Sequence, residues 1–105
     1  MSAFVFMALY RPKPGLENKL REILKLHIPV LREEGLLTDR ELLTLQAEDG
    51  TIIEIAEWKS SEAIDKAHQS EKVKAVWEQI AAAAELTNLS SLAEAQYPFP
   101  NFKAI

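Results

Sequence analysis

The stretch "EDGTIIEIAEW", residues 48–58, decides how the first half of the chain folds. It begins with an Asp-Gly pair between two apolar runs, which is typical of a β-hairpin. In the returning strand, alternate side chains point to opposite faces, so Glu54 shares a face with Ile52 and Ala56. The pattern therefore predicts a buried carboxylate. A buried carboxylate needs a partner, and Arg40 across the hairpin is the predicted one.

The elements on both sides of the hairpin are marked by apolar periodicity, by Pro and Gly turns and by serine caps. They are a strand over residues 3–10, a helix from Leu16 to a stop at Gly35, a strand within 36–47 and the returning strand over 51–58. A short helix capped by Ser60 or Ser61, a second helix over 71–85 and a last strand over 89–97 follow. The order β-α-β-β-α-β predicts an α+β fold of the ferredoxin-like type, an antiparallel sheet with helices on one face. We expect one domain over residues 1–105, with its core at 3–97 and a docked tail at 98–105.

The first strand, "AFVFMALY" (residues 3–10), is apolar on both of its faces. Helices on one side of the sheet would cover only one of them, so a second layer must cover the other. A second copy of the chain would supply that layer. Burial by self-association would also help a chain of only 105 residues, and we therefore expect a homodimer.

The composition limits the partners. The net charge is -4 and the basic residues form no run, which argues against nucleic acid and against anionic membrane surfaces. The chain has no cysteine, which excludes disulfides, thiolate nucleophiles and Cys-based zinc sites. The apolar run near the N-terminus is too short to span a membrane and lacks the flanks of a signal peptide. We expect a cytoplasmic protein without a metal or an organic cofactor, because no phosphate loop or nucleotide fingerprint is present.

Three segments together resemble the antibiotic biosynthesis monooxygenase-like family of dimeric α/β barrels. They are the first strand running into "RPKPG" (11–15), the hairpin ending in "IAEWKSSEAIDKAH" (55–68) and "SEKVKAVWEQI" (70–80). The resemblance covers residues 3–97 and implies a homodimer whose sheets face each other, with a cleft between the sheet and the helices of each subunit. It leaves the activity open, because the family includes cofactor-free oxygenases acting on aromatic polyketides and quinols, haem-degrading enzymes and small-sugar isomerases.

The haem-degrading branch of that family does not fit the sequence. Its members use an Asn on the first strand, a Trp in the helical stretch after the hairpin and a His further along. Counting from Trp58, the last two positions fall on Ala67 and Trp77, and the first strand has no Asn. The comparison residue by residue thus argues against haem degradation.

Five side chains are candidates for a site in the cleft. His27 lies on the apolar stripe of the first helix and His68 on the apolar side of the short helix, so both imidazoles are predicted to point inward. A neutral imidazole can act as a general base near pH 7, which makes His68 and His27 the predicted catalytic residues. Tyr10 and Arg11, at the end of the first strand, and Trp77, at the wall of the cleft, are the predicted ligand-binding residues.

Two kinds of function remain open. One is a cofactor-independent monooxygenase acting on a small aromatic or quinone-like molecule, with His68 as its base. The alternative is a non-catalytic dimeric small-molecule-binding or stress-response module, in which both histidines are hydrogen-bonded packing residues. An isomerase would need cationic groups in the cleft, for which Arg11 is the one candidate. A cavity of about 300 Å³ or more with both imidazoles at its wall favours a ligand site, whereas a filled core favours packing.

Overall fold

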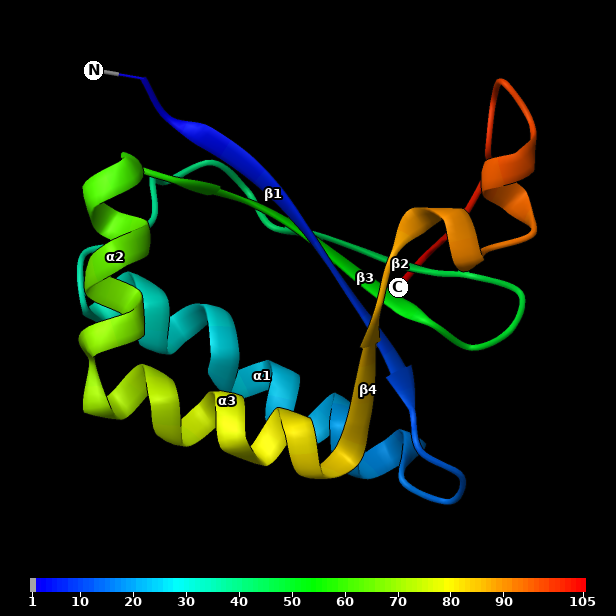
Figure 1. Ribbon diagram of the computed structural model, residues 1–105, viewed down its shortest axis with the longest axis horizontal. Coiled ribbons are helices and arrows are strands. Elements are labelled where there is room, and N and C mark those ends of the chain that lie inside the picture. Colours follow the sequence, from blue (N-terminus) through cyan, green and yellow to red (C-terminus); the bar gives the residue numbers. More distant parts are fainter. Residues whose placement is uncertain (1) are drawn as a thin grey trace.

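The computed structural model describes residues 2–105 as one five-stranded antiparallel sheet with three α-helices (Figure 1). The strands are β1 (Phe4–Pro12), β2 (Leu43–Gln46), β3 (Ile52–Trp58), β4 (Ala84–Thr87) and β5 (Lys103–Ala104). The α-helices are α1 (Glu17–Glu33), α2 (Ser61–Gln69) and α3 (Glu71–Ala83), and two 3-10 turns, η1 (Leu89–Ser91) and η2 (Glu94–Gln96), follow β4. The strand order is β4-β1-β3-β2-β5. The predicted α+β class with an antiparallel sheet is confirmed.

The helices lie together on one side of the sheet, and the chain after β4 lies on the other (Figure 1). In the central pair, β1 and β3 run antiparallel with Tyr10 opposite Ile52 and Phe6 opposite Ala56. These side chains share the face that packs against the helices, as the alternation of the sequence predicts. Glu54 lies on the same face and is 1% exposed, so its predicted burial is confirmed.

The turn between β2 and β3 has the geometry that its Asp-Gly pair predicts. Gly50 adopts φ +93, a region that side-chain-bearing residues rarely enter. The Thr51 amide donates to Asp49 Oδ1 at 2.9 Å, and the Ala47 amide donates to the Thr51 carbonyl at 2.8 Å. These bonds fix the register that brings β3 back along β2.

Two serines set the start of the helices that follow β3. Ser60 Oγ accepts from the Ala63 amide at 3.2 Å and begins α2, while Ser70 Oγ accepts from the Val73 amide at 3.3 Å and begins α3. Such caps satisfy backbone donors that have no partner within the helix. In α1, Pro29 is exposed and lies inside the helix without ending it. The caps split the second helical region into two pieces, as the sequence predicts.

The prediction for the end of the chain is wrong in two places. The alanine run was expected to keep the helix going to residue 85, but α3 ends at Ala83 and β4 begins at once. Pairing with β1 overrides the helix propensity of alanine here: Ala84 lies opposite Pro12, and the Lys13 amide donates to the Ala83 carbonyl at 2.9 Å. Residues 89–97, expected to be a strand, instead form the 3-10 turns η1 and η2.

We call residues 88–105 the C-terminal segment. It crosses the face of the sheet that the helices leave open, where Leu92 packs on Leu9 and Ile53 and is 1% exposed. Phe102 also contacts this cluster, and the segment ends in β5, which pairs with β2. The tail beyond residue 97, expected to dock on the body or on a partner, thus contacts the sheet of its own chain.

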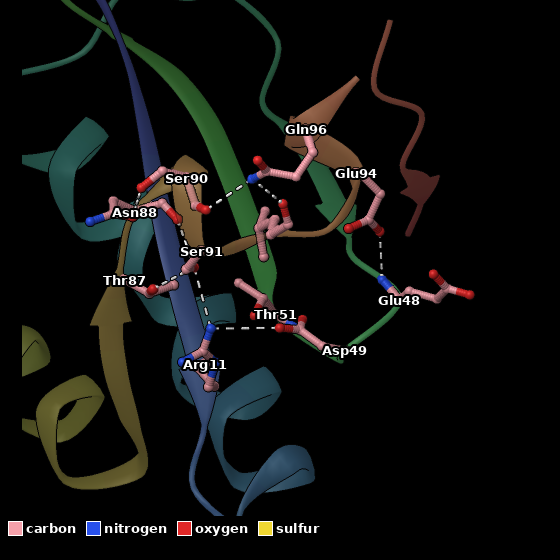
Figure 2. Close-up of polar contacts among 11 residues, drawn as sticks. Arg11, Glu48, Asp49, Thr51, Thr87, Asn88, Ser90, Ser91, Glu94 and Gln96 are labelled. Atoms are coloured by element: carbon pink, nitrogen blue, oxygen red, sulfur yellow. Dashed lines mark hydrogen bonds and ion pairs between the residues drawn. The ribbon is translucent and has the colours of Figure 1, made fainter. Parts of the chain in front are cut away.

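Polar contacts fasten the C-terminal segment to the strands beneath it (Figure 2). The Arg11 guanidinium donates to Ser91 Oγ at 3.3 Å and lies 3.6 Å from Asp49 Oδ2 in the hairpin turn. The Glu48 amide donates to Glu94 Oε2 at 2.7 Å. Burial acts to raise the pKa of Asp49, but the hydrogen bond from the Thr51 amide and the charge of Arg11 outweigh it, so this pKa is lowered.

The rest of the open sheet face stays bare. Val5, Met7 and Leu43 lie on it and are 57%, 41% and 49% exposed. They are neighbours, because Met7 and Leu43 flank Ile55 from the two sides of β3. The C-terminal segment therefore covers the half of this face near the hairpin turn and leaves an apolar patch over the start of β1. Among residues 2–105, no helix has both the length and the apolar composition needed to cross a bilayer.

Candidate functional site

A cavity of about 360 Å³ lies between the sheet and the helices. Its walls come from strands and helices far apart in the sequence: Ala8, Tyr10, His27, Trp58, His68, Trp77, Ile80, Ala81 and Leu86. Most of these side chains are apolar, and the polar atoms among them belong to two imidazoles, a phenol and two indoles. Small-molecule sites have this character, an apolar hollow with a few placed polar groups. Four of the five predicted site residues, all but Arg11, therefore come together at one cavity.

A hydrogen-bonded chain of four side chains runs through the core beside this cavity. Glu54 Oε1 accepts from the Tyr10 hydroxyl at 2.8 Å and from His27 Nδ1–H at 2.8 Å. On the other side of the imidazole ring, the Trp77 indole Nε1–H donates to His27 Nε2 at 2.9 Å. We call Tyr10, Glu54, His27 and Trp77 the polar relay. Each member comes from a different element, β1, β3, α1 and α3 respectively.

Tyr10 is held as a neutral phenol. Its side chain is buried, and burial together with the neighbouring Glu54 carboxylate raises the pKa of Tyr10 far above its usual range. The hydroxyl is 3.5 Å from His27 Nδ1 but 2.8 Å from Glu54, so the carboxylate is the acceptor of its hydrogen bond. The phenol can therefore donate a hydrogen bond in this site but does not serve as a base.

The predicted partner of Glu54 is wrong. Arg40 instead lies 3.2 Å from Glu57, on the opposite face of β3. The hydrogen bond from Thr38 and the contact with Arg40 lower the pKa of Glu57. Arg40 precedes β2 on the solvated side, whereas Glu54 points into the core and meets His27, which is 27 positions away along the chain.

His68 lies at the outer part of the cavity. Its ring packs edge-on against Trp77, with the ring centroids 5.0 Å apart, and the side chain is exposed on the solvent side. Nδ1 lies 2.9 Å from the Ile64 carbonyl, which can only accept, so Nδ1 carries the proton and Nε2 the lone pair. Within residues 2–105, this Nε2 has no hydrogen-bond partner. His68 is therefore the imidazole whose acceptor nitrogen a ligand can reach without displacing a protein group.

Arg11 is not brought to the cavity. It follows Tyr10 directly in β1, so its side chain points to the opposite face of the sheet, where it contacts the C-terminal segment (Figure 2). Its predicted role in ligand binding stays a prediction that this geometry does not support. Trp58, which ends β3 and is expected to be either structural or at a dimer contact, packs on Phe6 with ring centroids 5.0 Å apart and also lines the cavity.

Glu54 is predicted only as half of a structural ion pair, yet its hydrogen bonds to Tyr10 and His27 make it part of the site. Its position on the same face of the strand as Ile52 and Ala56 predicts that it is buried. No residue near it in the sequence indicates that it bonds to His27. Within residues 2–105, no three side chains of His, Asp or Glu gather as a metal-binding set. The polar relay offers hydrogen bonds rather than a ligand shell.

The comparisons with known proteins agree with this fold. A solved structure of the Mycobacterium tuberculosis protein Rv0793 matches with a TM-score of 0.66 over 82% of this chain and 91% of that chain, at 21% sequence identity. No curated protein matches the chain significantly. The model of the family described as antibiotic biosynthesis monooxygenase matches residues 3–79. This match spans most of the chain, including β1, the hairpin and nearly all of the three helices, so the chain belongs to the antibiotic biosynthesis monooxygenase family.

Proposed function

We propose that this chain binds a small, largely apolar aromatic or quinone-like molecule in the 360 Å³ cavity and oxidises it with O₂ without a cofactor. The observation that carries the proposal is the meeting of both imidazoles, the phenol and both indoles at one apolar cavity. Membership of the monooxygenase family supports the reaction class. The cavity volume of about 360 Å³ falls within the range of typical small-molecule pockets, which begins at about 300 Å³.

In the proposed reaction, His68 Nε2 removes a proton from an acidic C–H beside a phenol or ketone of the substrate. The resulting carbanion is the reductant of O₂. Conversion of a ring CH₂ to C=O gives up four electrons, so one oxygen atom ends in the product carbonyl and the other leaves as water. The protein supplies the base, orients the substrate through the polar relay and keeps the carbanion away from water.

A second candidate function is binding without catalysis. It is supported by the hydrogen bonds of the imidazoles, because both nitrogens of His27 and Nδ1 of His68 already have protein partners. Under this function, the cavity would hold a small molecule and His68 would only pack against Trp77.

We also propose that the protein acts as a homodimer. The bare patch of Val5, Met7 and Leu43 is apolar and continuous across three strands, and a second copy placed face to face would cover it. The C-terminal segment already occupies the half of this face near the hairpin turn, so the partner sheet would pack over the start of β1.

Oxygen uptake with an anthrone and a naphthohydroquinone as probes tests the two functions. His68→Ala should abolish enzyme-dependent uptake while binding of the probes persists, with Gln69→Ala, an exposed neighbour on α2, as the matched control. Binding of the probes to the wild-type chain without uptake would favour the non-catalytic module. Uptake that survives in His68→Ala would remove His68 as the base.

A further inference from the structure

Glu54 is an unusual residue for the middle of an apolar core. It is 1% exposed, and none of the ion pairs among residues 2–105 joins it to a lysine or an arginine. A buried carboxylate is costly, and an apolar side chain of similar size often gives a more stable core. Packing alone therefore gives no reason for a carboxylate at this position. Its two hydrogen bonds, from Tyr10 and His27, show what it does instead.

The donors and acceptors along the polar relay are set by two groups, the indole of Trp77 and the carboxylate of Glu54. The indole Nε1 of Trp77 can only donate, so His27 Nε2 must accept and carries a lone pair. The proton of the neutral ring is then on Nδ1, which donates to the Glu54 carboxylate at 2.8 Å. An ionised carboxylate can only accept, so it stabilises this tautomer over the one with the proton on Nε2.

We infer that Glu54 is a positioning residue that fixes His27 with its Nε2 lone pair at the cavity wall, so that the site selects a neutral ligand with a hydroxyl or N–H donor. This inference rests on the proposed function. His27 and Trp77 both line the cavity, so the bond between them lies at its wall. A ligand hydroxyl that takes the place of the indole N–H keeps Nε2 satisfied.

The same arrangement disfavours other ligand chemistries. A carbonyl or carboxylate oxygen at this place would set a lone pair against the lone pair of His27 Nε2. An anionic ligand would also lie near the buried charge of Glu54, with no lysine or arginine among the cavity-lining residues to offset it. The inner end of the cavity is therefore selective for donors.

The first test reads the histidine tautomer and needs no ligand. Nitrogen NMR on protein labelled at histidine should show His27 protonated at Nδ1 and bare at Nε2, with His68→Gln used to assign the two rings. In Trp77→Phe, which removes the indole donor, His27 should still be protonated at Nδ1, because the Glu54 carboxylate holds that proton. When Glu54→Gln is added to Trp77→Phe, the charge is lost and the Nε2–H form of His27 should become populated. Glu57→Gln is the matched control, because it lies three positions on, faces the other side of β3 and should leave the tautomer unchanged. A wild-type His27 protonated at Nε2 would overturn the inference.

The second test uses three probes of the same ring size: 2-naphthol, naphthalene and 2-naphthoate. In the wild type, the hydroxyl of 2-naphthol exchanges for the indole N–H at His27 Nε2 and gains no net hydrogen bond there, so we expect a small preference for 2-naphthol over naphthalene, with 2-naphthoate binding weakest. Trp77→Phe keeps an aromatic wall but removes the competing N–H, so in this variant 2-naphthol should bind roughly 3- to 10-fold more tightly than naphthalene, the value of one net hydrogen bond. Equal binding of all three probes would overturn the inference and leave the proposed function standing. Binding of none of them would overturn the proposed function, whatever the tautomer.

Discussion

Replacing Tyr10 with phenylalanine removes one hydroxyl from the polar relay and leaves the ring in place. The side chain is 3% exposed, so phenylalanine fills the same space and opens no large cavity. The lost interaction is a 2.8 Å hydrogen bond to a carboxylate, and bonds to charged groups contribute about 1.5–3 kcal/mol. We expect Tyr10→Phe to lower the free energy of unfolding by this amount at pH 7.

Urea unfolding followed by circular dichroism measures this loss, and the m-value should stay unchanged because the folded state keeps its compactness. The pH dependence provides a second, independent readout. The raised pKa of Tyr10 keeps the phenol neutral in the folded protein, while in the unfolded chain it ionises at about pH 10. Ionisation then favours the unfolded state, so the advantage of the wild type over Tyr10→Phe is full below pH 10 and falls above it by about 1.4 kcal/mol per pH unit.

The chain has two tyrosines, so Tyr97→Phe leaves Tyr10 as the one phenol whose absorbance can be followed. Because Tyr97 is 70% exposed, this background substitution should have little effect on folding. In it, tyrosinate absorbance should appear only as the protein unfolds. A loss of less than about 0.5 kcal/mol in Tyr10→Phe, or ionisation of Tyr10 in the folded protein near pH 10, would refute the reasoning.

Three further predictions concern the open face of the sheet. Leu92→Ala should lower the free energy of unfolding by about 2–5 kcal/mol in urea melts, with Leu89→Ala, 40% exposed, as the milder control. Asp49→Asn should have a lower free energy of unfolding than the wild type at pH 7. Because the pKa of Asp49 is lowered in the folded state, this difference in free energy should disappear as the pH falls below about 4. An equal difference at pH 7 and pH 3 would contradict this. Val5→Lys with Met7→Lys should leave the fold intact by circular dichroism and convert a dimer to a monomer in sedimentation; an unchanged dimer would place the interface elsewhere.

The fold was largely predictable because its decisive signals are local. The Asp-Gly turn, the alternation in β3 and the serine caps each act over a few residues, and each produced the structure that it predicts. The end of the chain was not predictable in this way. There, a run of alanines with high helix propensity ends in a strand because it pairs with β1. The paired residues are more than 70 positions apart in the sequence.

The site was predictable in its members but not in their connections. Helical spacing predicts that His27 points inward, and the structure buries it. The same spacing predicts that His68 points inward, but the structure leaves this side chain exposed at the cavity. Strand alternation revealed that Glu54 is buried but could not say what it meets, since its partners lie on β1 and α1. Neighbouring side chains of a strand point to opposite faces of the sheet, so Arg11 and Tyr10 cannot both face the cleft. The prediction that both bind a ligand there does not take this into account.

The polar relay draws one residue from each of four elements, and this has a consequence for how the protein opens. The indole proton of Trp77 can exchange with solvent only when its bond to His27 breaks, and His27 is held in turn by Glu54 from the central strand of the sheet. Separation of α1 or α3 from the sheet, or of β1 from β3, takes the relay apart. Deuterium exchange at this single proton would therefore report how often the bond between Trp77 and His27 breaks, and a ligand that displaces the indole would speed it up.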